Sequence, residues 1–152
     1  MRVILQRIYQ FRNQFSYFYK SDDDTFSIIE NLKHELANHN PDDPFMNGHR
    51  WHLRIPGGYF SGGAGHVLPR EALKRIVEKA IFKHPKCHDT DEAMEDVKMS
   101  ICGSAVGVKR IDLLDEKGES LFCPSDIKYP FDNYKPEPQL PVDSEPFFDA
   151  NE

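Results

Sequence analysis

Apolar side chains recur at helical spacing in four segments of the chain. The pattern over residues 2–14 predicts an amphipathic first helix, and the pattern over residues 25–39 predicts a second. Residues 69–84 are expected to form a third helix, because a proline opens the segment and the apolar stripe stops before the next proline. A shorter helix is predicted over residues 91–102, with Gly103 as its stop signal.

Strand patterns alternate with these helices. The aromatic run at residues 15–19 is typical of a buried strand. Residues 106–114 form a second candidate strand, which a turn connects to a third at residues 120–123. Residues 57–65 contain too many glycines for an ordinary helix. This order of elements predicts an α/β fold.

Composition and charge limit the classes of function. At 152 residues, 39% of them hydrophobic, the chain is the size of one domain and is able to bury a core. Its 25 acidic against 19 basic residues give a net charge of −6, which offers no broad basic surface, so nucleic acid is not expected as a partner. No apolar run approaches the roughly 20 residues that span a bilayer, and arginines interrupt the N-terminal segment, so neither a membrane span nor a signal peptide is expected.

The C-terminal part of the chain differs in composition from the rest. Residues 124–152 hold six of the eleven prolines, and seven acidic residues against two lysines. Such a composition resists compact packing. We therefore expect a folded domain over residues 1–123 and a loosely ordered, proline-rich acidic tail over residues 124–152.

Three consecutive carboxylates lie between Lys20 and Thr25. They stand between a predicted strand and a predicted helix, where ligands collect in α/β folds. Asp side chains suit Mn²⁺ or Mg²⁺ that also contacts substrate phosphates. The structural alternative is that an Asp merely caps the following helix.

Two further clusters are candidates for chemistry. The run from Ser61 to Gly65 lets the backbone approach a ligand closely, although a structural turn explains it equally well. Glu95 and Asp96 lie on the predicted fourth helix. A carboxylate there either takes a proton from an acceptor hydroxyl or belongs to a solvated helix face.

The cysteines and histidines give weaker signals. Three cysteines are too few and too scattered for a zinc site, and an odd number cannot close completely into disulfides within the chain. Cys87 and Cys102 flank the fourth helix, so they either form a disulfide or remain buried thiols. Three histidines lack ligand-like spacing and are expected at the surface or in loops: His66, His84 and His88.

The order of these motifs carries a family resemblance. The motifs are Lys20-Ser-Asp-Asp-Asp-Thr25 with Glu30-Asn-Leu32, Gly58-Tyr-Phe-Ser-Gly-Gly-Ala-Gly65 with Val67-Leu-Pro-Arg-Glu-Ala-Leu73, and Glu95-Asp-Val97 before Cys102. Together they resemble the core 1 β1,3-galactosyltransferases, which are related to the fringe-like β1,3-glycosyltransferases. The resemblance covers about residues 5–124. It implies an inverting enzyme that transfers galactose from UDP-galactose to N-acetylgalactosamine on Ser or Thr of glycoproteins.

The resemblance also implies a cofactor and a donor site. Asp22 and Asp24 match the family's metal motif, with Asp24 as the direct Mn²⁺ ligand. Asp22 and Asp23 would lie close to the nucleotide sugar, and Gly62 and Gly63 would lie against the donor sugar. The cation would stabilise the departing UDP.

Other roles follow from the same resemblance. Asp96 matches the family's general base, which deprotonates the acceptor hydroxyl. Trp51 and Tyr59 are candidate stacking surfaces for sugar rings. Cys87 and Cys102 match a family disulfide, which implies an oxidising lumen.

The resemblance finally implies a fold and a location. The family has a glycosyltransferase A fold, which is Rossmann-like, and its members are anchored in the Golgi membrane with the catalytic domain on the lumenal side. This chain is expected to be an incomplete copy, because the anchor and the N-terminal βα units do not precede residue 1. A homodimer is a further expectation. The alternative is a truncated, non-catalytic binding or folding-helper protein, because no histidine follows His88 to complete the family's metal site.

Overall fold

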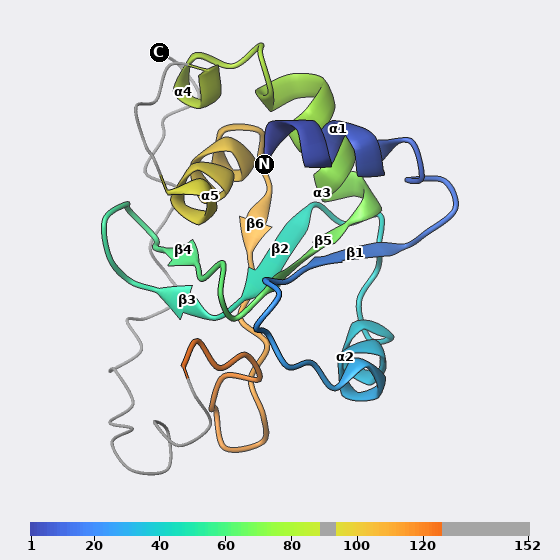
Figure 1. Cartoon of the computed structure of the whole chain (residues 1–152), viewed down its shortest axis with the longest axis vertical. Coiled ribbons are helices and arrows are strands. Elements are labelled where there is room, and N and C mark those ends of the chain that lie inside the picture. Colours follow the sequence, from blue (N-terminus) through green and yellow to red (C-terminus); the bar gives the residue numbers. More distant parts are fainter. Residues whose placement is uncertain (89–93, 126–152) are drawn as a thin grey trace.

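The structure is a computed structural model that describes residues 1–88 and 94–125 (Figure 1). Its centre is a mixed four-stranded sheet in the order β1-β5-β2-β6. The strands are β1 (Tyr17–Lys20), β5 (His66–Pro69), β2 (Phe45–Gly48) and β6 (Lys109–Arg110). β5 pairs antiparallel with both β1 and β2, whereas β2 and β6 are parallel. The architecture is therefore mixed α/β, as the alternating patterns predict.

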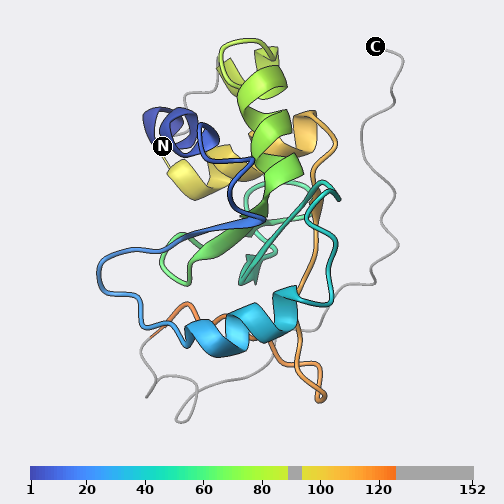
Figure 2. The same cartoon turned by 90° about the vertical axis from the view of Figure 1, so that its right-hand side faces the viewer.

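Helices cover both faces of this sheet (Figure 2). One face carries α1 (Arg2–Tyr9), α3 (Arg70–Arg75), the π-helical segment η1 (Ile76–Ala80) and α5 (Glu95–Ala105). The opposite face carries α2 (Ile29–Leu36). The smaller elements are α4 (Pro85–His88) and the two-stranded arm of β3 (Arg50–Trp51) and β4 (Tyr59–Phe60). None of the helices in the described part of the chain is long and apolar enough to cross a membrane.

Strand alternation divides the core into two clusters. In the β1–β5 pair, Phe18 opposes Leu68 and faces α1, α3 and α5, whereas Tyr19 opposes Val67 and faces α2. The buried residues of the larger cluster are Leu5, Met46, Phe60, Leu68, Ala72, Leu73, Ile76, Ile81, Met99 and Val108. Those of the smaller one are Leu36, Ala64, Val67, Leu113 and Phe122. Most of the apolar area that stabilises the fold is therefore buried on the side that carries α5.

Helix boundaries differ from the predicted ones. α1 ends at Tyr9, and turns rather than helix continue to residue 14. The predicted stop at Gly103 is wrong, because this glycine lies inside α5, where an added Cβ would lie 3.4 Å from Met46 Sδ. The chain turns instead at Gly107, whose φ of 72° suits the left-handed region that glycine tolerates.

The C-terminal strands are also shorter than predicted. Only Lys109 and Arg110 of residues 106–114 pair in the sheet, and the segment at 120–123 is reduced to a bridge between Leu114 and Ser120. The turn between them is present, with the Gly118 N–H donating to the Asp115 carbonyl. Residues 126–152, which include most of the predicted tail, lie outside the described part of the chain, as do residues 89–93 of the predicted fourth helix.

Candidate functional site

The acidic run forms a turn at the end of β1. The Asp22 N–H donates to the Thr25 hydroxyl at 3.0 Å, and the Thr25 N–H donates back to the Asp22 carbonyl at 3.3 Å. α2 begins only at Ile29, and its N-cap residue Ile28 makes no side-chain capping bond. The capping interpretation of the three acids is therefore wrong, because the helix starts several residues after them. Asp22, Asp23 and Asp24 all have exposed side chains.

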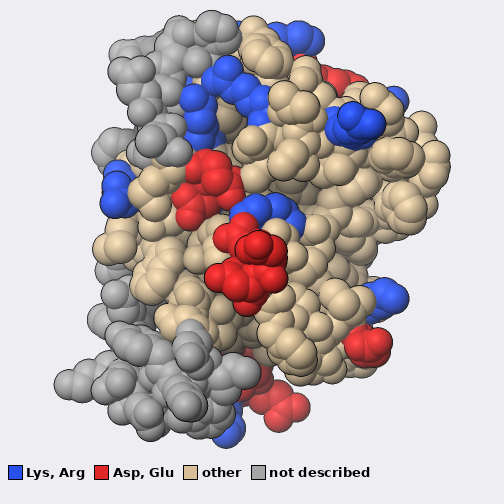
Figure 3. Space-filling view, in the orientation of Figure 1, with Lys and Arg blue, Asp and Glu red and all other residues tan. Residues whose placement is uncertain are grey.

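Lys20 joins this acidic turn to two other segments. Its ammonium donates to Asp22 Oδ1 at 2.6 Å, to Glu95 Oε1 at 2.8 Å and to the Gly62 carbonyl at 3.3 Å. Burial lowers the pKa of Lys20, but the hydrogen bonds to Asp22 and Glu95 more than offset this, so the pKa is raised overall. Acidic side chains flank a basic one near the centre of the face in Figure 3. Ion pairs that are this exposed contribute about 1 kcal/mol or less each to stability.

The glycine turn forms the second wall of the site. The Gly65 N–H donates to the Gly62 carbonyl, and the Thr25 hydroxyl donates to the Gly63 carbonyl at 2.9 Å. A Cβ at Gly62 would lie 3.1 Å from Glu95 Oε1 and 3.3 Å from Lys20 Nζ. A Cβ at Gly63, in contrast, would meet no described atom within 4 Å. The turn is thus packed on one side and open on the other.

Asp96 lies in the first turn of α5, next to the glycine turn. Its Oδ2 accepts the Gly62 N–H at 3.1 Å, and its Oδ1 accepts the Val97 N–H at 2.8 Å. The partial positive charge of a helix N-terminus favours carboxylates at this position. The fold therefore brings Asp96, Asp22 and the glycine turn together, although they are far apart in the sequence.

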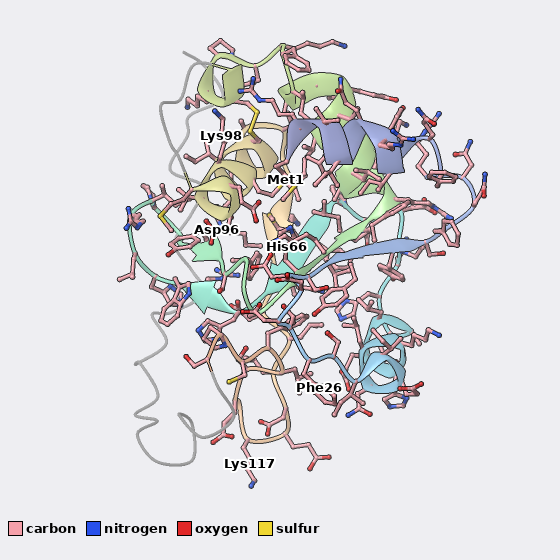
Figure 4. The ribbon with its side chains drawn as sticks, in the orientation of Figure 1. Met1, Phe26, His66, Asp96, Lys98 and Lys117 are labelled. Atoms are coloured by element: carbon pink, nitrogen blue, oxygen red, sulfur yellow. A yellow bond between two sulfur atoms is a disulfide. The ribbon has the colours of Figure 1, made fainter. Side chains whose placement is uncertain are left out.

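The surface or loop position predicted for His66 is wrong. The residue begins β5, directly opposite Lys20 in β1, and only 1% of it is exposed (Figure 4). Neither ring nitrogen has a hydrogen-bond partner among the described residues. The pKa of His66 is lowered to about 4, mainly by burial and also by the Lys20 charge, whereas the Asp96 and Asp22 charges act in the opposite direction. His66 is therefore neutral at pH 7. The apolar run that follows it, Val67-Leu68, is the signal that marks this segment as a buried strand.

The other histidines have different environments. His84 follows η1 and is half-buried, with Nδ1 unpaired among the described residues. His88 lies in the last turn of α4.

The two aromatic candidates lie on the β3–β4 arm. Trp51 opposes Tyr59 in this antiparallel pair, and the Trp51 ring contacts the His49 ring edge-on at a centroid distance of 4.8 Å. Tyr59 is 6% exposed, whereas Trp51 is half-buried. Trp51 therefore presents more of its ring to the surface than Tyr59 does. β4 leads directly into Ser61 and the glycine turn.

Cys87 and Cys102 form a disulfide that joins α4 to α5, with the two Cα atoms 4.9 Å apart. This bond fixes the C-terminal half of the helix whose first turn carries Asp96. Cys123 is an exposed free thiol.

The donor atoms present suit a hard divalent cation only if substrate completes the coordination. Within residues 1–88 and 94–125, no group of three or more His, Cys, Asp or Glu side chains is arranged to hold a metal ion. Mn²⁺ and Mg²⁺ are commonly held by one or two carboxylates together with water and substrate phosphates. The Lys20 ammonium already binds the Asp22 carboxylate oxygen and the Gly62 carbonyl oxygen, which are hard donors. Hard oxygen donors suit Mn²⁺ and Mg²⁺, so the chemistry of the turn fits such a cation.

Comparisons with known proteins agree with the order of the motifs. No protein-family model matches the chain. The chain is 41% identical over 112 residues to the glycoprotein-N-acetylgalactosamine 3-beta-galactosyltransferase 1 of Xenopus laevis, a match that covers 74% of the chain and 30% of that protein. It is 32% identical over 99 residues to the beta-1,3-glucosyltransferase of Mus musculus (63% of the chain, 19% of that protein). It is 31% identical over 90 residues to the Homo sapiens beta-1,3-glucosyltransferase (57% and 17%).

The chain thus spans less than a third of the length of these relatives. The matches extend to proteins with two different printed sugar specificities, galactose and glucose, but share the β1,3 linkage. The chain belongs to the β1,3-glycosyltransferase family.

Proposed function

We propose that this chain carries the catalytic centre of a β1,3-galactosyltransferase that moves galactose from UDP-galactose to N-acetylgalactosamine O-linked to Ser or Thr of glycoproteins. The observation that carries the proposal is the convergence of three segments. Lys20 and Thr25 donate to the carbonyls of Gly62 and Gly63, and the Gly62 N–H donates to Asp96. The printed name of the Xenopus laevis relative supports the choice of galactose and N-acetylgalactosamine.

Asp96 is the proposed general base. Two backbone N–H groups orient its carboxylate, and each of its oxygens keeps a further lone pair for an acceptor hydroxyl. Removal of the hydroxyl proton makes the acceptor oxygen a nucleophile for the anomeric carbon. Attack from the face opposite UDP inverts that carbon in a single displacement, in which the sugar–phosphate C–O bond breaks and UDP leaves.

Asp22 and Asp24 are the proposed ligands of Mn²⁺. When bound, the cation supplies positive charge to the diphosphate as it departs. Asp23, beside them on the exposed turn, is the proposed contact to the nucleotide sugar. The open side of Gly63 is the proposed place for the donor sugar, because a ring would meet no Cβ there. Trp51 is the proposed stacking surface for a sugar ring, and Tyr59 a second one.

We also propose a partial glycosyltransferase A fold and a location on the lumenal side of the Golgi membrane. The mixed sheet with helices on both faces is compatible with the fold. The Cys87–Cys102 disulfide supports an oxidising compartment, because such bonds persist in secretory lumens.

Isothermal titration calorimetry and a transfer assay test this function. Asp24→Ala is expected to abolish Mn²⁺-dependent UDP binding, whereas Glu116→Gln, a change in an exposed turn, leaves it intact. Asp96→Asn is expected to keep UDP binding but to slow galactose transfer to a GalNAc-bearing peptide at least about 100-fold, the usual scale of general-base catalysis. Parent protein that binds no UDP in the presence of Mn²⁺ would contradict the proposal.

The second candidate is a non-catalytic binding or folding-helper protein. The lack of a three-ligand metal group among the described side chains favours it. A helper would capture a full-length transferase without hydrolysing or transferring UDP-galactose. Co-purification with such a transferase, combined with a null transfer assay, distinguishes the two candidates.

A further inference from the structure

Among the described residues, Lys20 is the one basic side chain that forms an ion pair with the acidic turn, and it also pairs with Glu95. An ammonium group has three N–H donors, and here the three find separate acceptors: Asp22 Oδ1, Glu95 Oε1 and the Gly62 carbonyl. The register of β1 with β5 places Lys20 opposite His66, on the face that carries α5. The ammonium is therefore held at a defined point by the sheet and not only by its partners.

The three acceptors are not equally fixed. Glu95 lies in the first turn of α5, and Gly62 lies in a turn that is hydrogen-bonded to Asp96. Asp22 belongs to an exposed turn, and its side chain is 45% exposed, against 38% for that of Glu95. Asp22 is thus the outermost partner, and its loss would leave Lys20 with two acceptors from better-packed segments.

The ammonium and a divalent cation compete for the same atom. Asp22 Oδ1 is already 2.6 Å from Lys20 Nζ. A second cation on this carboxylate would stand within a few ångströms of the ammonium, where like charges repel strongly and salt screens little. We propose, on the basis of the function proposed above, that Lys20 is a resident counter-ion that gives up Asp22 and stays on Glu95 and Gly62 when Asp22 takes a divalent cation.

A scaffold role for Lys20 predicts the opposite result. If the ammonium only holds the acidic turn in shape, its removal disorders the turn, and metal binding becomes weaker. If the ammonium competes, its removal frees Asp22 and also removes a repulsive charge, so metal binding becomes tighter. The sign of the change in the dissociation constant therefore separates the two roles.

The experiment measures Mn²⁺ binding to the full chain by electron paramagnetic resonance of free Mn²⁺, at one fixed concentration of UDP, because substrate phosphates complete the coordination. Lys20→Met removes the charge and keeps an apolar stem of similar length. Lys117→Met, in an exposed turn, is the matched control for the change in net charge. We expect at least a fivefold lower Mn²⁺ dissociation constant for Lys20→Met and an unchanged one for Lys117→Met. A constant that is equal or higher in folded Lys20→Met overturns the inference.

A second variant keeps the test valid if Lys20→Met fails to fold. Glu95→Gln weakens the alternative acceptor, so Lys20 should stay on Asp22, and the Mn²⁺ dissociation constant should rise at least threefold. Where Lys20→Met does fold, the same change in that background should have little effect, which completes a double-mutant cycle. A Glu95→Gln variant that binds as tightly as the parent overturns the inference.

The outcome for the proposed function is read separately. If the parent binds Mn²⁺ and UDP but removal of Lys20 does not tighten Mn²⁺ binding, only the inference fails. If neither the parent nor Lys20→Met binds Mn²⁺ or UDP, both the inference and the proposed function fail.

Discussion

Acid is expected to destabilise this fold because His66 is buried as a neutral imidazole. Its pKa is about 4 in the folded chain, against an ordinary value of 6.5. Between these values the unfolded chain binds a proton that the folded chain does not bind, so the free energy of unfolding falls as the pH falls. A difference of about 2.5 pH units corresponds to about 3 kcal/mol, lost progressively from about pH 6.5 to about pH 4.

The structure gives the reason for this shift. His66 is 1% exposed and its ring nitrogens are unpaired among the described residues, so burial penalises the imidazolium. The charged groups that act on it are Lys20, which disfavours the proton, and Asp96 and Asp22, which favour it. The pKa would be lower still without the two carboxylates.

Urea denaturation at pH 7, 5.5 and 4 measures this effect. His66→Phe replaces the imidazole by an apolar ring that cannot bind a proton. Between pH 7 and pH 4, the free energy of unfolding of this variant is expected to fall by about 3 kcal/mol less than that of the parent. His52→Phe, at an exposed position, is the control and should follow the parent. Equal losses in the parent and His66→Phe, within 1 kcal/mol or so, would refute the assignment of a buried neutral His66.

Three further predictions concern the scaffold. Replacing Cys87 and Cys102 by alanine is expected to cost about 3 kcal/mol in urea denaturation, because the disulfide closes a loop with a sequence separation of 15; an unchanged midpoint would contradict this. Gly58→Ala should lower the melting temperature more than Gly118→Ala does. Both have positive φ, but a Cβ at Gly58 would lie 2.3 Å from a backbone oxygen, whereas one at Gly118 meets nothing within 4 Å. Gly103→Ala is expected to raise the free energy of unfolding by up to about 1 kcal/mol, because its nearest contact would be 3.4 Å and alanine favours helix; a lower melting temperature would indicate a tighter fit than the structure has.

The fold was predictable only in part, because β5 and β2, the two central strands of the sheet, were not predicted from the sequence. Apolar periodicity located the first residues of α1, α3 and β1 to within about two residues, because burial of one face is a local property of the pattern. Boundaries were less predictable. The Gly103 signal was misleading because a glycine inside a helix and one after it look the same in a sequence, whereas their backbone conformations differ: Gly103 is helical and Gly107 has a φ of 72°.

The candidate site was predictable only in part. The order of the acidic run, the glycine run and Glu95-Asp96 predicted which segments matter, but not the contacts between them. The Lys20 ion pairs depend on the β1–β5 register, and the burial of His66 depends on the same pairing. Such long-range contacts leave no periodic signal. The roles of Asp22, Asp24 and Asp96 in metal binding and catalysis stay predictions.

The β1–β5 register has a consequence for changes in chain length. Side chains of neighbouring strand residues point to opposite faces, so a one-residue deletion within the aromatic run would exchange the faces of Tyr19 and Lys20. A phenol would then point toward the carboxylates of α5, and an amine would enter the apolar layer over α2. Natural or designed variants of this protein should therefore tolerate substitutions in β1 far better than insertions or deletions there.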